Sequence, residues 1–142
     1  MKRDKKKQPF KKWTAWNNIP DKPDEANCVS KPGDIVAKIG QVWCLCQREN
    51  DYNNIVVFIQ PGKYMPQMDV YRCLFAFAYR LRRYAGIEYL TIQGRKGRYD
   101  FLMKILPPPI VVPGDIENDW QLWFMHITDD AMKRLFILKK GF

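Results

Sequence analysis

Residues 55–93 read IVVFIQPGKYMPQMDVYRCLFAFAYRLRRYAGIEYLTIQ, and this stretch decides the fold. Its first six residues, Ile55–Gln60, are β-branched or aromatic at nearly every position, which is typical of a central strand. A helical pattern follows over 69–85, and Ile87–Gln93 then alternates between apolar and polar residues as a further strand does. A strand, a crossover helix and a strand predict a parallel βαβ unit at the centre of the chain.

The predicted helix has recognisable ends and two different sides. Asp69 is expected as its N-cap, and Gly86 stands where a left-handed C-cap belongs. The 3.6-residue period places one set of apolar residues on a single, buried side: Val70, Cys73, Leu74, Phe77, Leu81 and Tyr84. Arginines and two aromatics are expected away from that side: Arg72, Phe75, Tyr79, Arg82 and Arg83.

Further strands and helices are predicted on both sides of this unit. Residues 34–47 are expected to form one strand, either regular or bent at Gly40, and a short helix is expected over 99–106. Residues 110–112 and 120–127 predict two more strands, and Thr128 is expected to cap a C-terminal helix. The fold class is therefore α/β, with a mixed sheet of the α+β kind, a central βαβ unit, flanking antiparallel strands and a C-terminal helix. Residues 34–142 are expected to form one globular domain, after a basic arm and proline-rich lead-in over 1–33.

The composition fits a small folded domain without a membrane span. The chain has 142 residues, of which 46% are hydrophobic, which is enough to bury a core. No stretch approaches the roughly 20 apolar residues of a spanning helix, and the basic N-terminus lacks the apolar core of a secretory signal. A cytoplasmic location and reduced cysteines are therefore expected.

The element order resembles that of GNAT-type N-acetyltransferases. That family has a strand, a helix, a strand, a short helix and a closing hairpin, which would correspond here to residues 55–60, 69–85, 87–93, 99–105 and the strands within 110–127. The junction YAGIEYL over 84–90 is the most family-like stretch. The chain is also similar to the acetyltransferase-shaped internal virion proteins of tailed phages, which implies a location within a virion after assembly.

The family's phosphate-binding loop has a different sequence here. In the family a glycine-rich loop and the helix N-terminus hold the pyrophosphate of coenzyme A. The corresponding residues here read GKYMPQMD over 62–69. Bulky side chains crowd the backbone, Pro66 removes an N–H donor, and Asp69 places negative charge where an anion would bind. Lys63 is the one residue of this loop that could attract a phosphate, and a single lysine does not make a diphosphate site. No cofactor is therefore expected.

Positive charge is concentrated in two places. Positions 1–12 hold seven basic residues against one acidic residue, and a run of this kind favours an anionic partner. These residues are Lys2, Arg3, Lys5, Lys6, Lys7, Lys11 and Lys12. A second set comprises Arg72, Arg82 and Arg83 of the helix with Arg95, Lys96 and Arg98 of the following turn. Both sets are candidates for binding nucleic acid or an acidic protein.

Four aromatic residues lie beside these charges and have two readings each. Trp13 and Trp16 either staple the arm onto the domain, which is the favoured reading, or contact a partner. Phe75 and Tyr79 lie one helical turn apart among arginines. They either stack on bases or form a second packing layer.

No self-sufficient catalytic or metal site is expected. Glu88, Tyr99 and His126 are general-base candidates by residue type only. Cys44, Cys46 and His126 include metal-ligand types but lack the paired spacing of a zinc site.

Three functions remain open from the sequence. The preferred hypothesis is a non-catalytic, acetyltransferase-shaped assembly protein, of a phage virion or associated with nucleic acid, whose basic arm binds acidic partners. The second is an active N-acetyltransferase that uses acetyl-coenzyme A with an atypical phosphate loop. The third is a small regulatory protein that binds a host enzyme.

Overall fold

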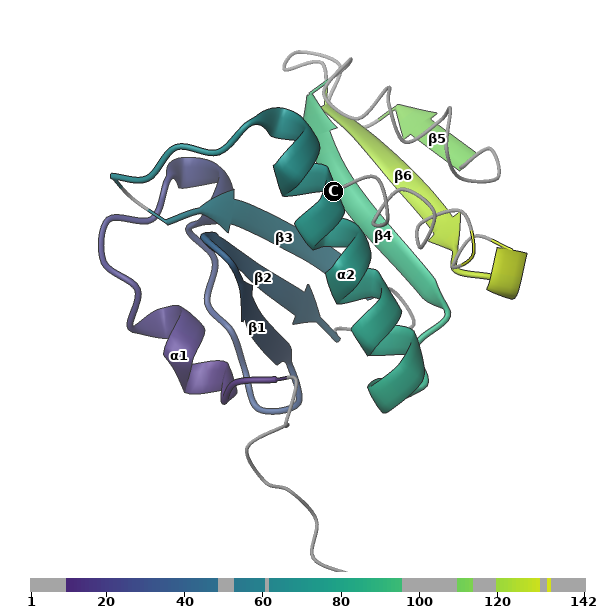
Figure 1. Ribbon diagram of the computed structural model, residues 1–142, viewed down its shortest axis with the longest axis horizontal. Coiled ribbons are helices and arrows are strands. Elements are labelled where there is room, and N and C mark those ends of the chain that lie inside the picture. The colour runs from purple at the N-terminus through teal and green to yellow at the C-terminus, as the bar shows by residue number, and fades with distance from the viewer. Residues whose placement is uncertain are drawn as a thin grey trace, which may run out of the picture.

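The computed structural model describes residues 10–48, 53–60, 62–95, 110–113, 120–130 and 133. These residues form a six-stranded mixed sheet in the order β1-β2-β3-β4-β6-β5. The long helix α2 lies across one face of the sheet, and α1 lies near the β1 end (Figure 1). The strands are β1 (Ile35–Ile39), β2 (Val42–Gln47), β3 (Asn54–Ile59), β4 (Tyr89–Arg95), β5 (Ile110–Pro113) and β6 (Trp120–His126). The helical segments are α1 (Trp13–Asn17), the 3₁₀ turn η2 (Asp24–Ala26) and α2 (Gln67–Ala85).

The central βαβ unit is confirmed. β3 and β4 pair in parallel, and α2 connects them. All other strand pairs among the described residues are antiparallel, which confirms the predicted mixed sheet. Parallel neighbours need such a crossover because the chain must return to the same end of the sheet before the second strand begins.

One end of α2 matches its prediction and the other does not. Gly86 is left-handed at φ 69°, and its N–H donates to the Arg82 carbonyl at 3.2 Å, as a glycine C-cap does. Asp69 is not the N-cap. The helix begins at Gln67, because the Pro66 carbonyl already accepts the N–H of Asp69 at 2.9 Å. Asp69 instead lies in the first turn, where a carboxylate is favoured by the helix dipole.

Residues 34–47 form a hairpin, so the prediction of one bent strand is wrong. β1 and β2 pair antiparallel from Ile35 opposite Cys46 to Ile39 opposite Val42. Gly40 and Gln41 therefore make a two-residue turn, in which Gly40 has φ +59°. Two-residue hairpin turns require positive φ, which glycine adopts without a steric penalty. The sequence showed Gly40, but a single glycine marks a bend and a turn equally well.

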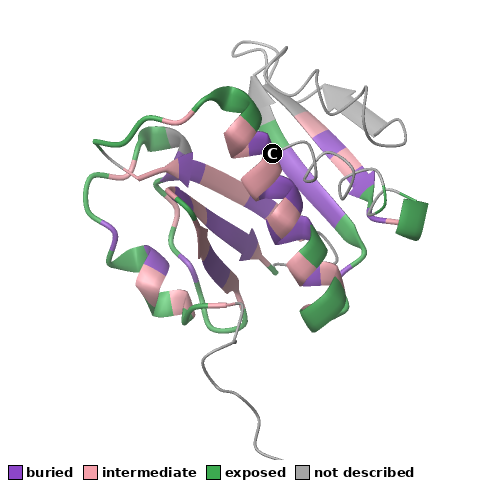
Figure 2. Ribbon diagram, in the orientation of Figure 1, coloured by how far each residue is buried: buried purple, intermediate pink, exposed green. Residues whose placement is uncertain are grey.

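The sheet buries apolar side chains on both faces of its β1–β3 half. On the side of α2, Cys44 and Ile55 pack with Leu74, Phe77 and other helix residues. On the opposite side, Val36, Leu45 and Phe58 pack with Trp16, Ile19 and Ala26. Figure 2 shows buried residues in α2, in the strands and in α1. The segment that the sequence assigned to the arm and lead-in thus contributes to the folded body from Phe10 onward.

Two residues of α2 do not lie where the helical period places them. Phe75 is only 5% exposed, so the prediction that it faces outward is wrong. Tyr84, expected on the buried side, is 57% exposed. The buried side of α2 is wider than a narrow stripe, because Tyr71, Phe75 and Ala78 are also buried. A helix that covers several strands buries such a broad side.

Several predictions fall on residues outside the described ranges. The predicted helix over 99–106 is one of them. Of the predicted C-terminal helix, residues 129, 130 and 133 are described and are helical. Among the helices that the structure describes, none has both the length and the apolarity of a membrane-spanning segment.

Candidate functional site

The basic arm meets the folded body at the free edge of β1. The Lys11 N–H donates to the Val36 carbonyl at 2.6 Å, which pairs this point of the arm antiparallel with β1. The Phe10 ring contacts the ring of Tyr84 edge-on, with centroids 6.4 Å apart, and packs against the core on the α2 side. The chain therefore crosses the sheet edge at Phe10 and Lys11, held by one backbone bond and one aromatic contact.

A basic and aromatic cluster lies beside this crossing. The Nζ atoms of Lys11 and Lys38 lie 5.9 and 5.6 Å from the centroid of the Trp43 ring. Both distances are within the range of a cation–π interaction. Trp43 is half-buried and packs against the α1-side core. We call Lys11, Lys38 and Trp43 the edge cluster.

Two residues of the edge cluster were not expected from the sequence. Lys38 and Trp43 are direct cross-strand partners in the β1–β2 register, so their side chains share one face of the sheet. That relation exists only in the hairpin, and a single bent strand over 34–47 hides it. Recognising a two-residue turn at Gly40-Gln41 would have placed Lys38 beside Trp43.

The other arm residues are described only in part. Lys12 is exposed at the start of α1. Lys2, Arg3, Lys5, Lys6 and Lys7 lie outside the described residues, as do Lys96 and Arg98. Arg95 ends β4, but its side chain lies outside the description.

Trp16 anchors the N-terminal segment to the folded domain by its buried side chain, while Trp13 is half-buried. Trp16 is 0% exposed, its Nε1 donates to the Cys28 carbonyl at 2.9 Å, and its ring contacts Phe58 with centroids 5.2 Å apart. The Trp13 carbonyl accepts a hydrogen bond from Ser30 Oγ. These contacts bind the segment after the arm to the sheet. The alternative that Trp16 contacts a partner does not fit its complete burial.

The arginines of α2 do not form one free basic face. Arg72 pairs with Asp69, with 3.2 Å between Nη1 and Oδ1, and Arg82 pairs with Asp129 at 2.7 Å. Arg83 is exposed near the C-terminal end of α2, where its guanidinium carbon lies 5.7 Å from the Tyr84 ring centroid. A hydrogen bond with Tyr84 and the neighbouring tyrosines raise the pKa of Arg83 above its ordinary value.

Tyr79 and Tyr84 give this end of α2 an exposed aromatic surface. Tyr79 is 40% exposed and contributes to the raised pKa of Arg83. The predicted pair of Phe75 and Tyr79 is therefore replaced by Tyr79, Arg83 and Tyr84. Because Tyr84 also contacts Phe10, this surface adjoins the crossing of the arm.

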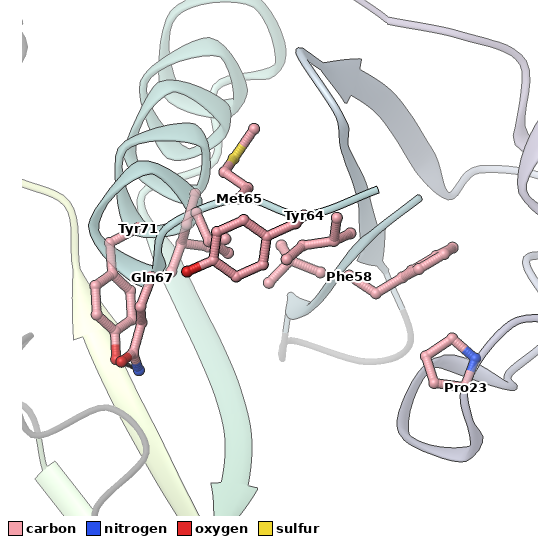
Figure 3. Close-up of a pocket in the computed structure, with 10 residues that line it drawn as sticks. Pro23, Phe58, Tyr64, Met65, Gln67 and Tyr71 are labelled. Carbon is pink, nitrogen blue, oxygen red and sulfur yellow. Dashed lines mark hydrogen bonds between the residues drawn. The ribbon is translucent and has the colours of Figure 1, made fainter. Parts of the chain in front are cut away.

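A cleft lies where β3 ends and α2 begins. It encloses about 540 Å³ and is lined by strand, loop and helix residues: Pro23, Val57, Phe58, Ile59, Tyr64, Met65, Gln67, Val70, Tyr71 and Leu74. Figure 3 shows Tyr64 between Phe58 on one side and the Gln67–Tyr71 pair on the other. Gln67 Nε2 and the Tyr71 hydroxyl are hydrogen-bonded at 2.8 Å. No lining residue carries a charge at neutral pH, and Lys63 is exposed outside the lining.

The two general-base candidates that the structure describes, Glu88 and His126, lie away from this cleft. Glu88 and His126 flank the amino end of β4, with 3.9 Å between Oε2 and Nε2, whereas the cleft lies at the carboxyl end of the parallel strand β3. The His126 ring stacks on Tyr89 at a centroid distance of 4.4 Å. Tyr99 lies outside the described residues. No side chain lining the cleft is a carboxylate or a histidine.

The cysteines do not assemble a metal site with His126. Cys44 and Cys46 are buried on the α2 side of the sheet, whereas His126 is exposed. Within the part of the chain that the structure describes, no group of three metal-ligating side chains gathers. Burial raises the pKa of the Cys46 thiol to about 12, and that of Cys44 further still. These thiols pack as small apolar side chains.

Comparisons of the chain with protein-family models, curated proteins and solved structures found no match. The class of the protein is therefore described from its fold and its two sites. It is a small mixed α/β protein with a basic edge cluster and an uncharged cleft.

Proposed function

We propose that this chain is a non-catalytic, acetyltransferase-shaped assembly protein that binds an acidic partner, nucleic acid above all, through its basic arm and the edge cluster. The observation that carries this proposal is the position of the Lys11 and Lys38 ammonium groups over the Trp43 ring. This ring lies beside the point where the basic arm reaches the sheet. The virion setting remains a prediction from the resemblance.

The acetyltransferase-like shape is supported by the order of the elements. A strand, a helix and a parallel strand are followed by an antiparallel pair, as in the family that the sequence resembles. Fold alone does not imply activity, so the function must be argued from the sites.

The absence of catalysis is supported by the chemistry of the cleft. In the resembled family, the loop between strand and helix binds a diphosphate, and a diphosphate needs cations or free N–H donors. Here the lining is uncharged, and the Asp69 N–H is already bonded within the helix. Asp69 itself adds a negative charge to the first turn. This arrangement disfavours a coenzyme A diphosphate.

The edge cluster has the composition of a nucleic-acid contact. Lysines neutralise phosphates, while an accessible aromatic ring stacks on an unpaired base, so the combination suits a single strand. The two lysines and the tryptophan lie on the β1–β2 hairpin and the arm beside it. The sequence holds five further basic residues within positions 1–9.

A charge-reversal experiment tests this proposal. The double variant Lys11→Glu, Lys38→Glu is compared with Lys133→Glu, an exposed lysine in the helical turns after β6. Binding to a fluorescently labelled 20-nucleotide single strand is measured by anisotropy at several salt concentrations. We expect the double variant to lose affinity at least tenfold and its salt slope to flatten by about 0.7 for each phosphate that is no longer neutralised. If it binds like Lys133→Glu, the edge cluster is not the interface.

An active acyltransferase is the alternative function, and it follows from the resemblance. The cleft lies between a strand and the N-terminus of a helix, where a coenzyme site would lie in that family. A thermal-shift titration with acetyl-coenzyme A separates the two functions. A ligand that binds the folded state raises the midpoint, by an amount set by its concentration and affinity. A clear rise would contradict the non-catalytic proposal, whereas the DNA experiment would be unaffected.

A further inference from the structure

The carboxyl half of β3 has a backbone edge that no described strand covers. β3 spans Asn54–Ile59, but its parallel pairing with β4 is confined to Asn54 and Ile55. On its other side β3 pairs with β2 along its full length. β3 and β4 diverge beyond the paired residues, as Figure 1 shows. Residues 56–59 therefore have a strand neighbour on one side only among the described residues.

The hydrogen-bonding pattern identifies which backbone groups lie on the open side. The Gln60 N–H donates to the Gln41 carbonyl at 2.8 Å, and these two residues continue the β2–β3 register. In an antiparallel pair, only alternate residues exchange hydrogen bonds with the partner strand. Val56 and Phe58 thus bond to β2, and the N–H and C=O of Val57 and Ile59 point the other way.

The two residues that carry these open groups belong to the lining of the cleft. Val57 and Ile59 both line it, opposite the first turns of α2. The lining is apolar or uncharged, with hydroxyl and amide groups from Tyr64, Tyr71 and Gln67. Tyr64, one of the lining residues, is 88% exposed. Backbone N–H and C=O groups that are neither paired nor well solvated carry a free-energy penalty, which a ligand that pairs with them removes.

We infer that the cleft binds an extended, uncharged peptide segment that adds to the open edge of β3. The N–H and C=O of Val57 and Ile59 present alternating donors and acceptors at the two-residue spacing of a strand, about 6.6 Å. An extended peptide offers the complementary series, and its alternate side chains enter the apolar cleft. A lipid or a flat aromatic ligand has no such series, and a charged ligand finds no counter-charge in the lining.

This inference is independent of the proposed function. The edge cluster lies on the β1–β2 hairpin and binds an anion, whereas the cleft lies beside β3 and binds a neutral chain. The chain would then hold a peptide of an assembly partner and an acidic partner at separate places. Failure in one experiment leaves the other unaffected.

The first test is amide exchange in the full chain without ligand. Because no described strand pairs with Val57 and Ile59 on their open side, we expect their amide protons to exchange with solvent at least tenfold faster than those of Val56 and Phe58. Nuclear magnetic resonance resolves the four residues individually. Equal protection of all four would overturn the inference, because the edge would then already be paired.

The second test adds a blocked tetrapeptide of alternating threonine and valine at about 1 mM, a concentration at which weak complexes form. We expect shifts and slowed exchange at the amides of Val57 and Ile59. The matched control is the same peptide methylated at its two edge-facing nitrogens, which removes the donors and keeps the side chains. It should bind at least tenfold more weakly. Unchanged amides with the first peptide, or equal binding of both peptides, would overturn the inference.

Two further probes separate the peptide from other occupants. Pantetheine also carries amides on an extended chain, and shifts with pantetheine but not with the tetrapeptide would overturn the peptide assignment. The variant Ile59→Pro removes one edge-facing N–H while leaving the bonds to β2. We expect it to weaken binding of the tetrapeptide and to leave DNA binding unchanged. If this variant does not fold, the comparison of the tetrapeptide with its methylated form still tests the inference.

Discussion

Trp16 is the residue whose burial ties the N-terminal segment to the sheet. It is fully buried, contacts Phe58, and donates its Nε1–H to the Cys28 carbonyl. We expect Trp16→Ala to lower the free energy of unfolding by about 3–5 kcal/mol, because it opens a large cavity and leaves a carbonyl unpaired. Urea titration of the variant measures this. Trp13→Ala, at a half-buried position, is the control and should cost much less. Equal losses would contradict the difference in packing.

The cysteine thiols make the stability depend on pH at the alkaline end. Burial raises the pKa of Cys46 from 9.0 to about 12 in the folded state, so folding favours the protonated thiol. The stabilisation is present in full below pH 9.0 and is lost as the pH rises toward 12. We expect Cys46→Ala to show a weaker loss of stability between these pH values, measured by thermal unfolding. A parallel decline in both proteins would show that other groups set the alkaline limit.

At the scale of the elements, the C-terminal end of α2 depends on a left-handed glycine. Gly86 adopts φ +69°, and an added Cβ meets no atom within 4 Å, so backbone conformation and not space determines the cost of a substitution. We expect Gly86→Ala to destabilise the chain by about 1–2 kcal/mol. Gly86→Asn is the matched control, since asparagine tolerates this conformation better and should cost less. The order is checked by chemical denaturation, and equal costs would contradict this account.

The elements that could be predicted from sequence are those with a strong local pattern. β3, α2 and β4 carry periodic apolar residues and the Gly86 cap, so their order and parallel pairing follow from residues 55–93. The β1–β2 hairpin was missed because apolar residues stand directly before and after Gly40-Gln41. Gln41 is the one polar residue of that turn, which is too weak a turn signal. The edge cluster was missed with it, since Lys38 meets Trp43 only through pairing. The open edge of β3 depends on where β4 diverges, which no local pattern encodes.

At the scale of the whole molecule, the crossing of the arm joins the two faces of the sheet. Phe10 packs toward α2, while the side chain of Lys11 lies over Trp43, on the side of α1. The Lys11 N–H also bonds to the edge of β1. This bond pairs one residue of an edge with which no described strand pairs. Unpaired strand edges can pair with other chains. The crossing thus positions the basic residues and protects the edge at one place.

Two deletions separate the charge of the arm from its packing. Removing residues 1–9 takes away five basic residues, and removing residues 1–12 also takes away Phe10, Lys11 and Lys12. Because Phe10 packs against Tyr84 and Lys11 bonds to Val36, we expect the longer deletion to be less stable than the shorter one by about 1–3 kcal/mol, measured by urea titration. Both should weaken binding to single-stranded DNA and flatten its salt slope. If the two deletions are equally stable, the crossing does not hold the sheet edge, and the arm contributes charge alone.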